Sequence, residues 1–154
     1  MFRISRRLDY GLQLMIALAN DPQSKPQSTA SLAEKLQIPL PFLHQIGHML
    51  MQAGLNKASP GPHGGVRLNK PVESITVLQI VEVLEGPVSL HPCGECNENC
   101  ERANTCSAQF AWSDLQDVVL RHMGSVTLES LAVTAQQLPI YSVAIETTEK
   151  VAVP

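Results

Sequence analysis

The sequence predicts a mainly α-helical protein with a small β-hairpin wing, that is, a winged helix-turn-helix followed by a long dimerisation helix. Two observations in the first half predict it: a pair of short amphipathic segments joined by a tight turn, and a turn-rich stretch between two short apolar segments. The third observation is a longer amphipathic segment that follows a loop holding every cysteine of the chain. Only 4% of the 154 residues are aromatic, so we expect an aliphatic core.

The first predicted helix covers residues 5–20. Its apolar side chains recur at three- and four-residue steps, as in a helix with one buried face. Asp21 and the proline after it end this helix, and residues 23–27 form a polar linker. The linker separates the first helix from the two that follow.

Two short helices joined by a tight turn are expected after the linker. Ser31 and Glu34 have the spacing of a capping box, so the second helix is expected to begin at Ser31 and to stop near residues 37–39. The third helix is predicted over residues 40–53, because a proline in its first turn loses no backbone hydrogen bond and Gly54 favours a stop. Together they have the helix-turn-helix pattern.

A β-hairpin is expected directly after the third helix. Residues 55–58 and 66–68 have the pattern of short strands, and residues 59–65 between them are rich in glycine and proline. Residues 75–84 then form another helix, which a Gly-Pro pair ends. A helix-turn-helix followed by a hairpin is the winged-helix arrangement, and we assign residues 1–86 to this DNA-binding domain.

The remaining chain divides into a loop, a helical region and a tail. The cysteine-rich loop occupies residues 87–106, and a helix is predicted over residues 107–123 within a dimerisation region, residues 107–132. Because its apolar surface is broader than a monomer needs, we expect a helix–helix dimer seam, with packing on the winged domain as the alternative. Residues 126–131 are expected to add one helical turn, and residues 133–154 to be a flexible tail.

Charge is distributed unevenly along the chain. Residues 1–70 carry eight Lys/Arg and three Asp/Glu, whereas residues 71–154 carry three Lys/Arg and eleven Asp/Glu. A basic first half suggests that this half faces a polyanion, with an uneven solvated surface as the plainer explanation. No segment approaches the roughly 18 apolar residues of a membrane span, and no apolar run of the signal-peptide kind follows the basic start. We therefore expect a cytoplasmic protein with no membrane partner.

Four cysteines lie close together in the second half, and the chain has no others: Cys93, Cys96, Cys100 and Cys106. Such a group is a ligand set, a disulfide framework or a redox switch. A reducing cytosol favours metal ligation or redox chemistry over structural disulfides. Thiolates suit both iron–sulfur clusters and zinc, but a single Cys-x2-Cys step is an incomplete zinc pattern. No catalytic constellation accompanies the cysteines, so we expect neither an enzyme nor a small-molecule substrate.

Several short motifs follow one another in order along residues 2–132. They are Arg3-Ile4-Ser5, Ser31-Leu32-Ala33-Glu34, Gly54-Leu55, Gly61-Pro62-His63-Gly64-Gly65, Ile75-Thr76-Val77, the cysteine loop, Trp112 and Thr127-Leu128. Their order and spacing resemble the IscR/NsrR type of winged-helix transcriptional regulators. The resemblance implies a homodimer that binds palindromic, double-stranded promoter DNA and holds an iron–sulfur cluster in the cysteine loop.

The resemblance also implies which residues hold the cluster. Three cysteines match the pattern of the family: Cys93, Cys100 and Cys106. Where the IscR branch has a histidine three residues beyond the last cysteine, this chain has Gln109, so the fourth ligand must differ. Asp9 is one candidate, because the nitric-oxide-sensing branch has an aspartate there that reaches the cluster from the partner subunit; a solvated surface acid is the plainer explanation. Cys96 is the other candidate, with His91 a distant third.

The function expected from the resemblance is transcriptional regulation, as a repressor, by a 4Fe-4S or 2Fe-2S cluster that senses redox state, nitric oxide or iron supply. Gain, loss or reduction of the cluster would order or loosen its loop and shift the two recognition helices against each other. The alternative is a cluster-free DNA-binding regulator whose cysteines form a thiol switch or hold zinc. An electron carrier would explain the cysteines but not the wing.

The DNA-contacting residues are expected on the third helix, on the wing and at basic positions around them. In a helix-turn-helix the second helix enters the major groove, and here it offers His44, Gln45, His48 and Gln52. Residues 36–56 contain no Lys, Arg, Asp or Glu, so phosphate contacts must come from elsewhere. The wing offers His63, and the basic residues are Arg3, Arg6, Arg7, Lys57, Arg67 and Lys70. We therefore expect weak binding that depends strongly on salt.

Overall fold

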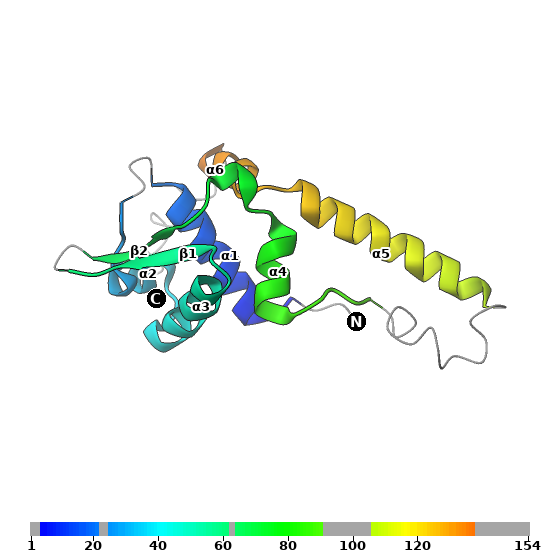
Figure 1. The fold of residues 1–154 in the computed structure, drawn as a ribbon, viewed down its shortest axis with the longest axis horizontal. Coiled ribbons are helices and arrows are strands. Elements are labelled where there is room, and N and C mark those ends of the chain that lie inside the picture. Colours follow the sequence, from blue (N-terminus) through cyan, green and yellow to red (C-terminus); the bar gives the residue numbers. More distant parts are fainter. Residues whose placement is uncertain (1–3, 22–24, 62–63, 91–105, 138–154) are drawn as a thin grey trace, which may run out of the picture.

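The computed structural model describes residues 4–21, 25–61, 64–90 and 106–137 (Figure 1). Its first part contains α1 (Arg6–Ala19), α2 (Thr29–Leu36), α3 (Leu40–Gln52), β1 (Asn56–Ser59), β2 (Gly65–Leu68), the short 3-10 helix η1 (Val72–Ser74) and α4 (Val77–Glu85). The second part contains α5 (Ser107–Ser125) and α6 (Leu128–Gln137). This order of elements confirms the predicted fold class, a winged helix-turn-helix followed by a long helix.

The core is aliphatic and lies where α1, α3 and α4 meet. Met15 of α1, Leu50 of α3 and Ile80 of α4 are fully buried and belong to one cluster. Apolar residues at three- and four-residue steps give each helix one apolar face, and burying these faces together forms the core. Leu128 at the start of α6 is also fully buried in this cluster. Helix α3 is therefore held by packing on its inner face.

The second helix begins earlier than the sequence predicts. Ser28 is the N-cap of α2, so Ser31 lies inside the helix and its expected capping box with Glu34 is wrong. The reason is a tertiary contact. Gln27 forms an isolated antiparallel bridge with Val66 of β2, with backbone N–O distances of 2.9 and 2.8 Å, which fixes the chain just before Ser28.

The turn and the hairpin agree with the sequence prediction. The turn between α2 and α3 passes through Gln37, whose φ of 54° lies in the left-handed region. β1 and β2 are antiparallel, with a register that runs from Asn56 opposite Leu68 to Ser59 opposite Gly65. The first strand begins one residue later than predicted and the second one residue earlier.

The end of α5 is fixed beside the start of α4. Thr76 caps α4 in a capping box with Gln79 and forms an isolated bridge with Thr127, which follows α5. The N–H of Leu128 donates to the carbonyl oxygen of Ile75 at 2.8 Å. From this attachment, α5 extends away from the rest of the molecule (Figure 1), and none of its residues is buried.

The last helix is longer than the single turn predicted over residues 126–131. α6 continues to Gln137 and packs against α1 and η1, so the first residues of the predicted tail are helical. A helix of this length forms here because it packs on α1. Residues 138–154, the rest of the predicted tail, lie outside the described residues. Among those that are described, no helix is both long and apolar enough to cross a membrane.

Candidate functional site: a DNA-binding surface and a cysteine segment

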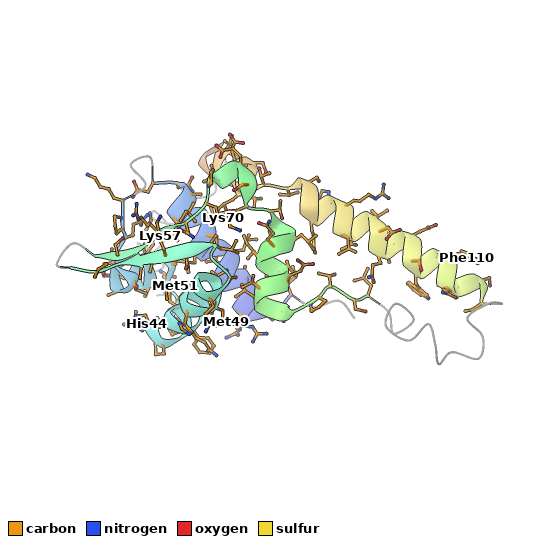
Figure 2. The ribbon with its side chains drawn as sticks, viewed as in Figure 1. His44, Met49, Met51, Lys57, Lys70 and Phe110 are labelled. Atoms are coloured by element: carbon orange, nitrogen blue, oxygen red, sulfur yellow. The ribbon has the colours of Figure 1, made fainter. Side chains whose placement is uncertain are left out.

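The outer face of α3 carries the polar side chains that the sequence predicts to meet DNA. His44, Gln45 and His48 are all exposed. Figure 2 shows His44 on α3 at the edge of the molecule. On the opposite face, Leu43 and Ile46 are buried in the core to 1% exposure or less. Packing on one side therefore orients α3, while its polar side remains accessible to a ligand.

The hairpin places two of the predicted phosphate contacts directly opposite each other. Lys57 of β1 pairs with Arg67 of β2, and opposite residues of an antiparallel pair project from the same face. Both residues are partly exposed, and Figure 2 shows Lys57 near the hairpin and Lys70 just beyond it. Two like charges in this position repel each other, and a phosphate group would relieve the repulsion. His63, at the tip of the wing, lies outside the described residues.

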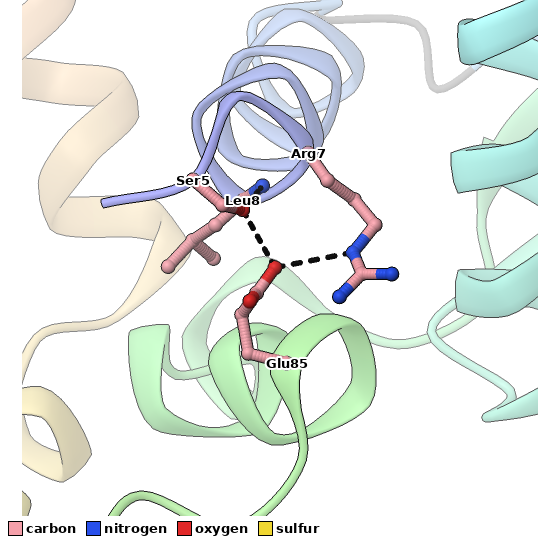
Figure 3. Close-up of polar contacts among 4 residues, drawn as sticks. All are labelled: Ser5, Arg7, Leu8 and Glu85. Atoms are coloured by element: carbon pink, nitrogen blue, oxygen red, sulfur yellow. Dashed lines mark hydrogen bonds and ion pairs between the residues drawn. The ribbon is translucent and has the colours of Figure 1, made fainter. Parts of the chain in front are cut away.

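Arg7, another predicted DNA contact, has a partner within the chain. Its Nε donates to Oε1 of Glu85 at 3.1 Å, and the hydroxyl of Ser5 donates to the same oxygen at 2.6 Å (Figure 3). The hydrogen bond from Ser5 and then the one from Arg7 lower the pKa of the Glu85 carboxyl. The start of α1 is thereby joined to the last residue of α4. Arg6 is exposed, and Arg3 lies outside the described residues.

Asp9, a candidate cluster ligand, lies on the exposed side of α1. Its Oδ2 accepts a hydrogen bond from Nε2 of Gln13, one helical turn later, at 3.0 Å. Cys106 is the N-cap residue of α5, and the start of α5 lies far from α1 (Figure 1). Within one chain the structure therefore does not bring Asp9 and Cys106 together.

Cys106 is the N-cap residue of α5 and the one cysteine in the described part of the chain. It is half-buried and its thiol is free. The other three cysteines and one histidine fall outside the described residues: Cys93, Cys96, Cys100 and His91. Within the described ranges, no group of three or more His, Cys, Asp or Glu side chains is placed to hold a metal ion. The ligand set therefore stays a prediction, and of its four cysteines only Cys106 lies within the described residues.

Gln116 of α5 holds the chain just before the cysteine segment, which we define as residues 91–105. Its Oε1 accepts the N–H of Leu90 at 3.0 Å, and its Nε2 donates to the carbonyl oxygen of Val88 at 3.3 Å. At the other end of the segment, the chain enters α5 through Cys106. Both ends of the cysteine segment are therefore attached to the same helix.

Three residues that shape this site were missed by sequence reasoning. Glu85 and Gln116 bond to residues far away in the chain, so no local pattern marks them. Asn56 is buried to 1% exposure at the start of β1. No local pattern marks Asn56 either, because its burial depends on how the hairpin packs against α3.

Comparisons with known proteins agree with this geometry. The model of the Rrf2 family, described as an iron-dependent transcriptional regulator, matches residues 4–134. The HTH-type transcriptional regulator CymR of Bacillus subtilis (strain 168) is 35% identical over 130 residues, which are 84% of this chain and 89% of CymR.

Two solved structures are also similar. The structure of CymR (YrzC), the global cysteine regulator of B. subtilis, has a TM-score of 0.72 and 34% sequence identity, and the match covers 87% of this chain and 98% of that one. T. potens IscR has a TM-score of 0.71 and 26% identity, with 88% and 90% of the two chains covered. The similarity thus extends over the winged domain and the long helix.

Proposed function

The chain belongs to the Rrf2 family of transcriptional regulators, and from this premise we propose that it is a dimeric repressor whose binding to promoter DNA is controlled by an iron–sulfur cluster at its cysteines. The family assignment confirms that the chain is a transcriptional regulator and not an enzyme. The observation that carries the finer proposal concerns α5. This helix exposes apolar side chains along its length and is attached to both ends of the cysteine segment.

The dimer forms through α5. In the single chain, Trp112 is 47% exposed, Leu115 38% and Val118 53%, and no residue of this 19-residue helix is buried. Exposure of large apolar side chains to water along one helix is unfavourable. Packing against a second copy of the helix buries these side chains away from water. A twofold pair of α5 helices places the two α3 helices symmetrically, as a palindromic operator requires.

Each subunit of the dimer reads one half of the operator. The polar face of α3, with His44, Gln45 and His48, enters the major groove, where glutamine can pair with adenine. Lys57 and Arg67 on the hairpin contact phosphates beside it. Arg7 contributes less than its charge suggests, because Glu85 already pairs with it.

The donor set suits an iron–sulfur cluster. Four thiols lie within a short stretch of chain, and sulfur is the ligand that such clusters prefer. Cys106 lies at the N-terminus of α5, where backbone N–H groups favour negative charge. When bound, the cluster supplies reversible electron uptake and reactivity toward oxygen or nitric oxide. Asp9 can act as a ligand only from the partner subunit, because α1 and the start of α5 are far apart in one chain (Figure 1).

The signal passes from the cysteine segment to DNA through α5. When the cysteine segment holds a cluster, it constrains its two ends, which are held by Gln116 and by Cys106. When it holds no cluster, this constraint is absent. The position of α5 against α4 then differs between the two states, and so does the spacing of the two α3 helices. The state whose spacing matches the operator binds it more tightly.

A second candidate is a cluster-free regulator whose cysteines act as a thiol switch or hold zinc. The likeness to CymR, the global cysteine regulator of B. subtilis, supports this alternative. So does Gln109, which stands where the IscR branch has a histidine ligand. Zinc and thiols give no visible colour, whereas iron–sulfur clusters do, so the two candidates differ in their absorption spectra.

The experiment is purification without oxygen, followed by a visible absorption spectrum and assays for iron, zinc and acid-labile sulfide. We expect brown protein that contains iron and sulfide, and we expect Cys106→Ser to lose both. The Asp9→Ala and Cys96→Ser variants are then compared. The variant that retains less iron and sulfide identifies the fourth ligand. Colourless protein without iron, even after chemical reconstitution, would contradict the proposal and favour the second candidate.

A further inference from the structure

Phe42 is a large apolar side chain that α3 leaves in contact with water. It lies in the first turn of the helix and is 50% exposed, whereas Leu43 beside it is fully buried. Its ring meets the ring of Tyr10 in α1 in an edge-to-face arrangement, with centroids 6.5 Å apart and an angle of 83° between the two planes. Aromatic rings favour this arrangement, which restricts how the Phe42 side chain can turn. Phe42 is therefore exposed and also held in a defined orientation.

Gln45 lies next to Phe42 on the surface of α3. Residues three apart in a helix are neighbours, with Cβ atoms about 5–6 Å from each other, and both side chains are exposed. In a recognition helix, the N-terminal residues meet the base edges in the major groove. Both residues belong to the N-terminal half of α3, so they are candidates for base contacts. We call Phe42 and Gln45 the reading pair.

The helix offers no charged group that could read the bases instead. Residues 36–56 contain no Lys, Arg, Asp or Glu. The commonest contact to guanine uses Arg or Lys, and cytosine is read by Asp or Glu. Glutamine makes two hydrogen bonds to the N6 and N7 atoms of adenine, whereas an apolar side chain such as phenylalanine contacts the 5-methyl group of thymine. The chemistry of the reading pair therefore matches A·T base pairs.

We propose that Phe42 reads the 5-methyl group of a thymine beside the adenine that Gln45 binds, so that each half of the operator carries two adjacent A·T pairs under the start of α3. Stacked base pairs follow each other at about 3.4 Å, a step that the spacing within the reading pair can span. Tyr10 is a positioning residue, since its ring holds that of Phe42. The inference rests on the proposed function, because α3 must enter the major groove.

Deoxyuridine tests the contact to thymine, because it differs from thymidine only by the absent 5-methyl group. A duplex is first selected from a randomised library by the protein in the form, with or without its cluster, that binds DNA more tightly. Each thymine of this selected duplex is then replaced by uracil, one position at a time in both half-sites, and Kd is measured by fluorescence anisotropy. One replacement should raise Kd by about fifteenfold, since each of the two methyl groups accounts for about fourfold.

Three variants assign this effect to Phe42. In Phe42→Ala the same replacement should leave Kd unchanged, because the ring that contacts the methyl group is absent. In Tyr10→Leu the effect of uracil should be smaller, while the Kd for the uracil duplex stays that of wild type. Met51→Ala is the matched control and should show the full effect, because Met51 is an exposed apolar residue near the other end of the same helix. Circular dichroism checks that each variant folds.

The adenine is tested in the same way with 7-deazaadenine, which lacks the N7 acceptor. This base should weaken binding by the wild-type protein but not by Gln45→Ala. The sensitive adenine should lie in the base pair next to that of the sensitive thymine. Sensitive positions that are separated by other pairs would contradict a single reading pair.

The outcomes separate this inference from the proposed function. A selected duplex whose Kd no uracil replacement raises, or an equal uracil effect in wild type and Phe42→Ala, would overturn the reading by Phe42 and leave DNA binding standing. An unchanged uracil effect in Tyr10→Leu would overturn the positioning role alone. If neither form of the protein selects a duplex, the proposed function fails, and this inference fails with it.

Discussion

Gly65 is the residue at which the hairpin meets the chain before α2. A Cβ atom there would collide with the backbone carbonyl of Gln27. The neighbouring Val66 forms the two backbone hydrogen bonds that join β2 to Gln27. The absence of a side chain at this position is therefore what allows the wing to lie against the start of α2.

We expect Gly65→Ala to destabilise the protein by about 1–3 kcal/mol, because a backbone atom cannot move aside as a side-chain end can. Urea unfolding measures the change. Gly47→Ala is the matched control of opposite sign, since nothing lies near its Cβ position and alanine favours a helix interior over glycine by about 0.5–1 kcal/mol. Equal stability of wild type and Gly65→Ala would contradict the close approach.

Glu85 makes the free energy of unfolding depend on pH in the acid range. Its carboxylate accepts hydrogen bonds from Ser5 and then Arg7, which lower its pKa below the ordinary value of 4.5. Because the folded state has the lower pKa, the stabilisation is complete above pH 4.5 and is lost as the pH falls through the folded-state value. Both partners are partly exposed, so the pair contributes about 1 kcal/mol or less.

Glu85→Gln should therefore be less stable than wild type near neutral pH, and the difference should shrink when the pH falls below 4.5. Urea midpoints across this range measure it. Glu82→Gln, at an exposed carboxylate of the same helix, serves as the control and should show no such trend. A difference that stays constant with pH would show that the carboxylate is not stabilised by its partners.

At the scale of the elements, the sequence could predict those helices and strands whose boundaries are set by nearby residues. It could not predict boundaries that are set by tertiary contacts. Helices α1, α3 and α4 follow the spacing of their apolar residues, and the hairpin follows its turn residues, so both were predictable. The start of α2 was not, because the bridge from Gln27 to Val66 sets it. The length of α6 was not either, because packing on α1 extends it.

The candidate site divides in the same way. The polar face of α3 could be predicted from residue types and helical spacing alone. The opposition of Lys57 and Arg67 needed the register of the hairpin, and the partners of Arg7 and Gln116 needed the fold. The buried amide of Asn56 was also missed, because its burial depends on how the hairpin packs against α2 and α3.

The apolar face of α5 yields a prediction for the whole helix. The double variant Leu115→Asp and Val118→Asp should turn the dimer into a monomer, because two buried charges in a helix–helix seam lack partners. Sedimentation velocity measures the mass, and circular dichroism checks that the helices remain. Asp114→Asn, a conservative change at an exposed position of the same helix, should leave the dimer intact. If the double variant has the mass of a dimer, the dimer interface does not lie at this face of α5.

At the scale of the whole molecule, the basic first half holds the winged domain, and the acidic second half holds α5 and the cysteines. α5 begins far from the winged domain and ends close to it, where Thr127 bridges to Thr76 at the start of α4 (Figure 1). Under the proposed function, this layout separates the cysteines, where the signal is received, from α3 and the hairpin, where DNA is read. Helix α5 connects the two.

The charge layout predicts how DNA binding responds to salt. The logarithm of the affinity should fall steeply with the logarithm of the salt concentration, and Lys57→Ala or Arg67→Ala should each reduce the slope by about 1. Fluorescence anisotropy over a salt series measures the slope. Lys35→Ala, a basic residue exposed on α2 away from the hairpin register, is the control. An affinity that does not change with salt would rule out phosphate contacts as the main source of binding.

The measurement that tests the central claim most directly compares DNA binding by the same protein with and without its cluster. Protein purified without oxygen is divided, one half is treated with a chelator and oxidant and then reduced, and both are titrated with the selected duplex at one salt concentration. Our account predicts Kd values that differ by about tenfold or more, the usual size of allosteric coupling, and a smaller difference in Gln116→Ala. Equal Kd values for the two halves would contradict it.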